Sequence, residues 1–592
     1  MNERFQARLG QRMDELKWLF YELYAFLPME ERDKQFALLL RDMEQAAEDR
    51  SEALRETDLR REAEPDWYRS AALTGYCLYV KEFAGNLQGV RSRLDYLDEA
   101  GVNYLHLMPL LDTVDGESDG GYAVSDFRTV KPELGTMADL EALTEDCRRR
   151  GMVCCMDFVM NHTSSHHAWA VKAREGDAVY QDYYFFYNDR TVPDEFEKTV
   201  PEVFPTTAPG SFTFVPETGK WVMTNFYPYQ WDLNYRNPAV LREMTANLLF
   251  LANRGIDVIR IDAVPYIWKE LGTTCRNLPQ VHSIVRMVRL ICECVCPAVI
   301  LLGEVVMAPE KLAPYFGSQE SPECHMLYNA TTMCTIWHTV ATRDTRLLKR
   351  QLEAVAALPE QFTFLNYIRC HDDIGWGLDY DYLKQLGMEQ VPHKAFLNAW
   401  FAGEIPGSPS RGERYNDDPR LGDARMCGTT ASLCGLETAE TPEQKADALR
   451  LDLMLHALIF FQNGLPVLYA GDEIGQLNDN GYHQDPLKAE DSRYLHRGCL
   501  DWRKAEARKS AGTPEQLLFD GIHALEEMRR QPVFGPGSRV FPLETGDDAL
   551  LALERRLGDR TLTAWFNFSD KEKQAAGSTL PAHGFLIAGE GK

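Results

Sequence analysis

Residues 153–162 read VCCMDFVMNH, and residues 256–264 read IDVIRIDAV. Each stretch is a short, nearly continuous apolar run, which is typical of a strand covered on both faces of a parallel sheet. Each also carries polar groups toward its carboxyl end: Asp157, Asn161, His162, Arg260 and Asp262. The two stretches therefore predict buried parallel strands with chemically active residues at their carboxyl ends.

Six further apolar runs follow the same pattern, at 75–80, 103–110, 298–305, 325–330, 362–369 and 466–471. Longer helical patterns separate them. Eight strands that alternate with helices favour a closed parallel barrel. We therefore expect the α/β class and a (β/α)8 TIM barrel.

Other segments do not fit a plain barrel. We expect a helical N-terminal domain, two insertions in barrel loops and a C-terminal antiparallel β-sandwich domain, because periodicity and turn signals change there. The expected segments are 1–72 (N-terminal helices), 73–162, 237–373 and 441–530 (barrel), 163–236 (inserted B-type domain), 374–440 (second insertion with acceptor loops) and 531–592 (β domain).

The amino-acid composition indicates which classes of molecule the protein can bind. The net charge of −26 disfavours nucleic acid and anionic membranes and suits a neutral substrate. The first residues contain no apolar secretory segment, and the 14 cysteines are scattered, so the cytoplasm is the expected compartment. No motif indicates a metal site or an organic cofactor. The oligomeric state stays open.

The strand-end carboxylates suggest glycoside chemistry. Two carboxylates about 5–5.5 Å apart can cleave a glycoside with retention, one as nucleophile and one as acid/base. We expect Asp262 as nucleophile and Glu304 as acid/base, with Asp372 stabilising charge on the sugar. Arg260 points the same way as Asp262 and should keep it ionised.

The blocks DFVMNH, RIDAV, GEV and CHDD occur in the order of the four sequence regions of the α-amylase family, glycoside hydrolase family thirteen, and QWDLNY is similar to its fifth region. The chain is identified as resembling that family over about residues 73–592. The flanks SDGGYAVSDFRTVKPELGT, TTCRNLPQVH, CHDDIGWG and DSRYLHR resemble its sucrose-using amylosucrase branch.

The resemblance implies roles for further residues. Asp119 and Arg493 match a salt bridge that seals the pocket floor, and Arg425 matches an acceptor-side arginine. The remaining positions implied to contact sugar are Tyr122, His162, Phe226, His371 and Asp373. Asn161 matches a calcium ligand of amylases, but the amylosucrase resemblance argues against calcium.

The resemblance implies that sucrose is the donor, that fructose leaves, and that a glucan receives the glucosyl unit. The sequence departs from the branch at Lys394, where arginine is expected, and in the loop 402–418. These departures leave acceptor choice and product length open. An alternative interpretation is that Lys394 does not bind the acceptor and is a solvated surface charge. Three other functions also stay open: a sucrose hydrolase, another α-glucosidase or transglucosidase, and a non-catalytic sugar-binding relative.

Overall fold

The computed structural model describes residues 3–417, 422 and 424–589. Eight parallel strands close into a barrel in which each pairs with the next barrel strand along the chain, and the last pairs with the first. This confirms the predicted (β/α)8 fold, because each of the eight apolar runs overlaps one barrel strand. They are β1 (Gly75–Leu78), β2 (Tyr104–Leu107), β5 (Val153–Val159), β11 (Val258–Asp262), β12 (Ile300–Gly303), β13 (Met326–Tyr328), β14 (Thr363–Asn366) and β17 (Leu465–Tyr469).

Strand register decides which polar groups meet at the carboxyl ends. β11 lies between β5 and β12, and its register pairs Arg260 with Asp157. On the other side, the Glu304 N–H donates to the Ile261 carbonyl at 3.0 Å. Residues two apart on a strand point to the same side, so Arg260 and Asp262 share a face. The register thus brings three carboxylates toward one guanidinium.

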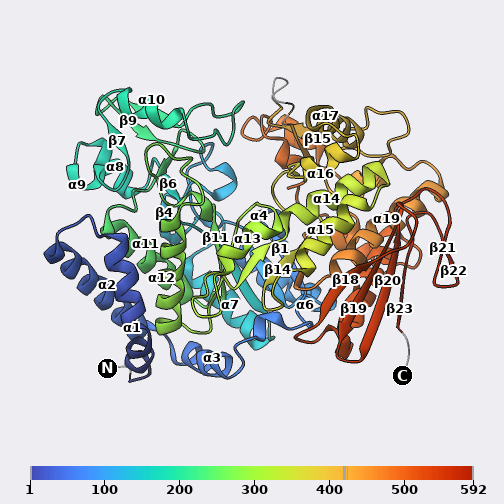
Figure 1. Cartoon of the computed structure of the whole chain (residues 1–592), viewed down its shortest axis with the longest axis horizontal. Coiled ribbons are helices and arrows are strands. Elements are labelled where there is room, and N and C mark those ends of the chain that lie inside the picture. Colours follow the sequence, from blue (N-terminus) through green and yellow to red (C-terminus); the bar gives the residue numbers. More distant parts are fainter. Residues whose placement is uncertain (1–2, 418–421, 423, 590–592) are drawn as a thin grey trace.

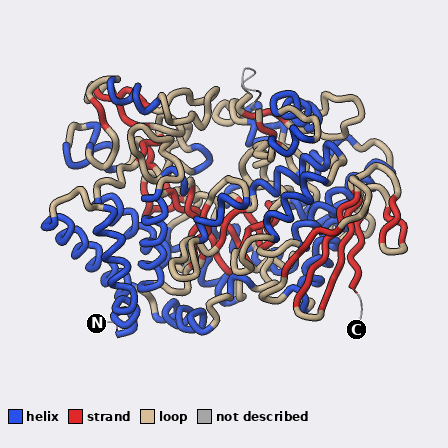
Figure 2. Tube along the Cα trace, viewed as in Figure 1, coloured by secondary structure: helices blue, strands red, loops and turns tan. Residues whose placement is uncertain are grey.

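Helices surround the strands in Figures 1 and 2. Their starts follow from local chemistry: a capping box formed by Thr136 and Asp139 begins α7, and one formed by Thr441 and Gln444 begins α19. Buried apolar faces then hold them on the barrel. The helices are α4 (Val80–Ala84), α5 (Leu87–Ser92), α6 (Leu94–Glu99), α7 (Met137–Arg149), α11 (Pro238–Ala252), α12 (Pro279–Val295), α13 (Pro309–Phe316), α14 (Ala330–Thr342), α15 (Arg346–Ala356), α19 (Pro442–Phe461), α20 (Trp502–Ala507) and α21 (Pro514–Arg529).

Three helices precede the barrel: α1 (Glu3–Leu23), α2 (Met29–Asp49) and α3 (Glu52–Ala63). α1 packs on α12 and α2 packs on α11, at the lower left of Figure 1. The buried residues of α1 recur every three or four positions, which is the apolar stripe of a helix that covers a core. They are Phe5, Leu9, Leu16, Leu19, Phe20 and Leu23.

Two long loops carry structure of their own on the upper side of Figure 1. The first holds a three-stranded sheet with its own small core, and a short strand, β10, that pairs with β6 beside the barrel. The second lies between β14 and α19; its residues 418–421 and 423 lie outside the described residues. The elements are β6 (His162–Ser164), α8 (Ala168–Arg174), α9 (Ala178–Gln181), β7 (Phe186–Tyr187), α10 (Thr191–Glu197), β8 (Phe212–Val215), β9 (Lys220–Met223), β10 (Gln230–Asp232), α16 (Tyr380–Gln385), α17 (Gln390–Phe401), β15 (Glu413–Tyr415), β16 (Arg425–Cys427) and α18 (Thr430–Leu433).

The C-terminal region is antiparallel. Four strands form one sheet in the order β18-β19-β20-β23, and the hairpin β21–β22 packs on it through Leu550, Ala575 and Leu580. The sheet appears at the lower right of Figure 1. The strands are β18 (Arg539–Leu543), β19 (Leu550–Leu557), β20 (Arg560–Asn567), β21 (Lys573–Ala575), β22 (Ser578–Leu580) and β23 (Phe585–Gly589); β3 (Leu111–Asp112) and β4 (Asp126–Val130) pair near the barrel.

Two further properties concern the molecule as a whole. Across the described ranges, every helix is too short or too polar to cross a lipid bilayer. Twelve of the 14 cysteines are buried, Cys370 is partly exposed and Cys499 is exposed, and all are free thiols.

A buried ion pair ties the N-terminal helices to the barrel. Arg50 binds Asp58 through two hydrogen bonds of 2.6 and 2.7 Å, and each side chain is 2% exposed. Arg50 also donates to the Ala252 carbonyl at the end of α11, and Asp58 accepts the Ala298 N–H before β12. The pair therefore links three parts of the chain.

We expect Arg50→Ala to lower the free energy of unfolding by about 3–5 kcal/mol, because it leaves the buried carboxylate of Asp58 without its cation. The double variant Arg50→Met with Asp58→Leu should be less destabilised, since no unpaired charge remains. Denaturant unfolding of the three proteins tests this. Equal losses for the single and double variants would contradict the argument.

Candidate active site

The centre of the site is the guanidinium of Arg260, whose side chain is 2% exposed. Its Nη1 lies 2.6 Å from Asp157 Oδ1 and 2.5 Å from Asp262 Oδ1. Its Nη2 lies 3.3 Å from Glu304 Oε1. Asp157 is held from its other side by His106 Nε2 at 2.7 Å. One buried cation thus contacts three carboxylates from three adjacent strands.

Asp262 and Glu304 are further linked through the backbone. Ala263, directly after Asp262, has a left-handed φ of 49°, and its N–H donates to Glu304 Oε2 at 2.9 Å. Such a conformation costs a non-glycine residue on the order of 1 kcal/mol and persists only where the surroundings enforce it. The turn therefore aims one oxygen of Glu304 at the residue beside Asp262.

The pKa of the Asp262 carboxyl is subject to opposing influences. Burial raises the pKa of the Asp262 carboxyl well above its ordinary value, and Arg260 lowers it without offsetting the burial. The neighbouring Glu304 and Asp157 raise the pKa of Asp262 further. Arg260 is shared among three acids, so its charge stabilises each of them only in part.

Two histidines frame the site in their neutral form. Burial lowers the pKa of His371 to about 3 and the pKa of His162 to about 4. The Tyr122 hydroxyl lies 2.7 Å from His371 Nε2 and donates to Asp157 at 3.1 Å, and its ring stacks on His371. His162 Nε2 contacts the Tyr122 carbonyl at 3.2 Å. Neutral imidazoles can exchange hydrogen bonds with uncharged hydroxyl groups.

Asp372 lies beside two arginines. Its Oδ1 is 3.7 Å from Arg493 Nη1 and 3.5 Å from Arg497 Nη2, and its side chain is 35% exposed. Burial acts to raise the pKa of Asp372, but His371 and the two arginines lower it, and the net direction is downward. Asp372 is therefore the permanently ionised carboxylate of the site.

Asp119 and Arg493 meet as the sequence predicts. Asp119 Oδ1 lies 2.8 Å from Arg493 Nη2, and Arg493 also binds Asp491 at 2.8 Å. A cavity of about 770 Å³ borders this bridge and is lined by Tyr79, Tyr227 and other residues, but by none of Asp262, Glu304 and Asp372. The bridge is therefore part of the wall of that cavity, and the three carboxylates are not.

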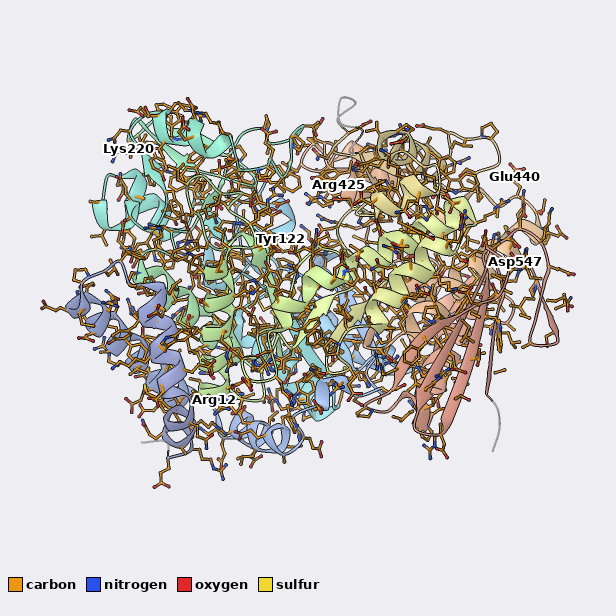
Figure 3. All side chains as sticks on the ribbon, viewed as in Figure 1. Arg12, Tyr122, Lys220, Arg425, Glu440 and Asp547 are labelled. Carbon is orange, nitrogen blue, oxygen red and sulfur yellow. The ribbon has the colours of Figure 1, made fainter. Side chains whose placement is uncertain are left out.

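The remaining predicted residues lie toward the second insertion. Asp373 Oδ2 is 3.6 Å from Arg425 Nη1, and Figure 3 places Arg425 above Tyr122. The Phe226 ring lies 5.2 Å from both His162 and Tyr266.

Lys394, on α17, is only 9% exposed, and its ammonium lies 5.7 Å from the Tyr380 ring. Its alternative reading as a solvated surface charge is therefore wrong.

Asn161 lies in a corner that does not fit calcium. Lys269 Nζ binds Asp232 Oδ1 at 2.7 Å and also contacts Asn161 Oδ1, with the side chains of Lys269 and Asp232 fully buried. A calcium ion requires several free oxygen ligands. Here a fixed ammonium already occupies these oxygens.

Sequence reasoning did not place several of these groups in the site: His106, Asp491, Arg497 and Lys269. Arg497 lies just beyond the short helical segment Ser492–Leu495 that carries Arg493, and no regular spacing points to it. His106 interrupts an apolar strand, which is a weak signal. Lys269 and Asp491 lie in irregular segments and become visible only through tertiary contacts.

A closed parallel barrel whose strand ends gather carboxylates around an arginine has the groups that cleavage of a glycosidic bond requires. The alpha-amylase catalytic-domain model matches residues 48–373. The chain therefore belongs to the alpha-amylase family and is a glycoside hydrolase or transglycosylase that acts on glucosides.

Relatives of known name agree with this family. The chain is 30% identical over 540 residues to a trehalose synthase of Pimelobacter sp., a match that covers 83% of this chain and 87% of the relative. It is 32% identical over 463 residues to a glucosylglycerate phosphorylase of Spirochaeta thermophila, covering 77% and 73% of the two chains. Four other trehalose synthases are matched over only 40 to 64% of their own length.

The fold has counterparts among solved structures. The sucrose 6F-phosphate phosphorylase from Thermoanaerobacter thermosaccharolyticum superposes with a TM-score of 0.66 at 18% identity, covering 84% of this chain and 94% of that chain. At this identity the likeness concerns the fold.

The lowered pKa of His162 makes stability depend on pH. An unfolded histidine binds a proton below about pH 6.5, whereas folded His162 does so only below about 4, so stability falls as pH drops through this window. Between pH 7 and pH 5 this one residue should remove about 2 kcal/mol.

His162→Gln should therefore flatten the pH dependence of the unfolding free energy between pH 5 and pH 7 by that amount. His483→Gln is the control, because the His483 side chain is 50% exposed. Denaturant unfolding at both pH values measures the slopes. A slope in the His162 variant equal to that of the wild type would contradict the assignment.

Proposed function

We propose that this enzyme is a retaining glucosyltransferase that takes a glucosyl unit from sucrose, releases fructose and adds the unit to an α-1,4-glucan. The observation that carries the proposal is the Asp119–Arg493 bridge, 2.8 Å long and buried beside Asp372. A closed floor accepts one terminal glucosyl unit and rejects a continuing chain. This selects small donors over internal cleavage of polymers.

The proposed first step uses the pair around Arg260. Glu304 donates a proton to the fructosyl oxygen as the bond to glucose breaks, and Asp262 bonds to the anomeric carbon. Asp262 must be ionised for this attack, and Glu304 must carry the proton that it donates. Arg260 stabilises the anionic form of Asp262, and the ionised Asp372 stabilises positive charge on the sugar ring.

In the second step a hydroxyl group replaces the leaving fructose. Glu304, now ionised, takes the proton of that hydroxyl, which attacks the glucosyl-enzyme and restores Asp262. Water and a glucan compete at this stage, and a bound glucan wins by being held in place. We assign the binding of the acceptor glucan to Asp373, Arg425 and Phe226. Lys394 supports the second insertion next to these residues.

A second candidate is the interconversion of maltose and trehalose. It is favoured by the 30% identity to trehalose synthase, which extends over 83% of this chain. Both candidates share a pocket for one glucosyl unit and differ in the group that leaves. The resemblance of the flanking blocks to the sucrose-using branch is our reason for preferring the first candidate. A hydrolase for sucrose or for other α-glucosides would use the same pocket, with water as acceptor.

One experiment separates these candidates. The purified enzyme is incubated with sucrose, maltose or trehalose, and glucose, fructose, disaccharides and glucan are measured over time. We expect sucrose to react fastest, with fructose released in excess over glucose and glucan formed. Equal fructose and glucose would indicate hydrolysis, and conversion of maltose to trehalose without sucrose turnover would overturn the proposal.

The catalytic pair gives a direct prediction. Asp262→Ala and Glu304→Gln should each lower the kcat for sucrose by about 10⁴-fold or more, because each removes a group that acts in the transition state. Glu310→Gln is the matched control, since Glu310 is exposed on α13. Thermal unfolding verifies the fold, and near-normal turnover in either folded catalytic variant would refute the roles.

The floor gives a second prediction. Arg493→Ala should lower kcat/KM for sucrose by about 100-fold, since Asp119 is left as an unpaired buried charge. Asp119→Asn with Arg493→Met should regain only part of the lost thermal stability, because Asp491 still lacks its cation, and should regain no activity, which separates sugar recognition from folding. Arg503→Ala, with a side chain 95% exposed, is the control. Wild-type enzyme that cut starch internally faster than sucrose would rule out a closed floor.

A further inference from the structure

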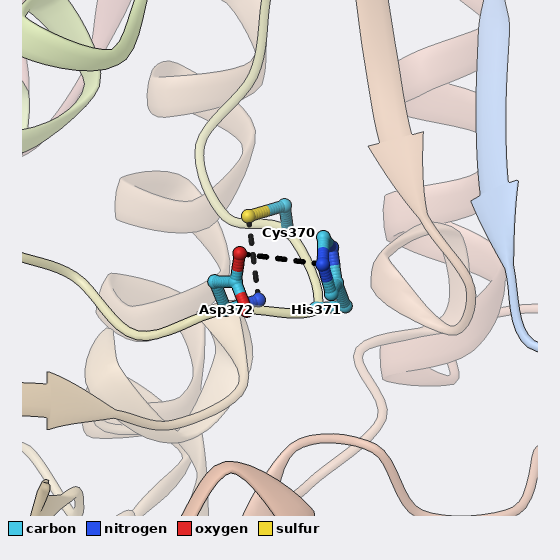
Figure 4. A group of neighbouring side chains, drawn as sticks. All are labelled: Cys370, His371 and Asp372. Atoms are coloured by element: carbon cyan, nitrogen blue, oxygen red, sulfur yellow. Dashed lines mark hydrogen bonds and ion pairs between the residues drawn. The ribbon is translucent and has the colours of Figure 1, made fainter. Parts of the chain in front are cut away.

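One group of side chains at the catalytic centre includes a thiol that the proposed sugar chemistry does not use. Cys370, His371 and Asp372 follow β14, and their sulfur, nitrogen and oxygen donor atoms lie within 4.8 Å of one another. Figure 4 shows the three side chains at one turn of the chain. His371 Nε2 lies 3.3 Å from Asp372 Oδ2, and Cys370 Sγ accepts the Asp372 N–H at 3.4 Å.

The donor set selects the kind of ion. A thiolate, an imidazole and a carboxylate together suit borderline and soft divalent cations such as Zn²⁺ and Cd²⁺, and a sulfur ligand disfavours Ca²⁺ and Mg²⁺. Tetrahedral zinc places such ligand atoms about 3.3–3.6 Å apart. His371 Nε2 and Asp372 Oδ2 already have this spacing, at 3.3 Å, and the Cys370 sulfur, which lies within 4.8 Å, has to move toward them. Three protein ligands leave a fourth position for water.

The arginines around the site compete with an ion for the Asp372 carboxylate. Arg493 and Arg497 both approach Asp372, but Arg493 is already paired with Asp119 and Asp491. When a divalent ion binds, Cys370 releases its proton to solvent and becomes a thiolate. The thiolate and the Asp372 carboxylate then balance both charges of the ion, and the arginines face a neutral group.

We propose that Cys370, His371 and Asp372 form an inhibitory site for a divalent zinc-like cation, which excludes the glucoside while it is bound. Asp372 and His371 cannot hold the ion and contact the sugar together. The inhibition rests on the proposed function of these two residues, whereas ion binding does not. Cys370 is the ligand that makes the site selective, because the other two residues serve the sugar.

Binding is tested with Cd²⁺ alone, on reduced and chelator-free protein, by the ultraviolet absorption of the cadmium–thiolate bond. The matched control is Cys499→Ser, which removes the exposed thiol and leaves Cys370 in place. Wild type and Cys499→Ser should show the band, and Cys370→Ser should lose it, with affinity for the ion weakened about tenfold or more. Cys370→Ala replaces the serine variant if thermal unfolding shows that the latter does not fold.

Inhibition is tested with Zn²⁺ during sucrose turnover, relative to the metal-free activity of each variant. Zn²⁺ should compete with sucrose, and its inhibition constant should rise about tenfold or more in Cys370→Ser but not in Cys499→Ser. Equal cadmium bands in wild type and Cys370→Ser would overturn the site, as would loss of the band in Cys499→Ser. If sucrose is not a substrate, the cadmium titration still decides whether the ion binds.

Discussion

One buried guanidinium, that of Arg260, determines the arrangement of the site. Three carboxylates contact it, and like charges held this close inside a protein repel strongly unless a cation or a proton compensates them. Asp157 has His106 as a second partner, so Asp262 and Glu304 share the part of the Arg260 charge that Asp157 does not need. That division is what acid/base catalysis by a carboxyl pair requires: one group charged and the other carrying a proton.

Arg493 repeats the arrangement at the closed end, with Asp119, Asp491 and Asp372 around a second guanidinium. In both clusters the carboxylates contact arginines inside the protein. His162 and His371, which lie beside these clusters, are neutral because burial lowers their pKa values. The pocket therefore offers fixed dipoles and hydrogen-bonding groups to an uncharged ligand, which accords with a sugar and with the acidic surface that the composition predicts.

The barrel could be predicted because its eight strands are apolar runs read directly from the sequence. The pairing of Asp119 with Arg493, 374 positions apart, was expected only from family resemblance. In the structure the two side chains form a hydrogen bond. The raised pKa of Asp262 could not be predicted, since it depends on burial and on how many acids share Arg260. Lys269 and Arg497 were missed for a similar reason, because contacts between loops leave no periodic pattern. The orientation of Lys394 likewise depends on how α17 packs.

The lysine that binds Asp232 and Asn161 has a consequence for the medium in which the enzyme can work. A dissolved ion leaves its site when its concentration falls, and the structure around it loosens accordingly. An ammonium group joined to the backbone by four methylene groups cannot diffuse away, so its local concentration is fixed by geometry. This corner of the barrel mouth should therefore hold its shape equally well in the presence of a strong chelator and in hard water.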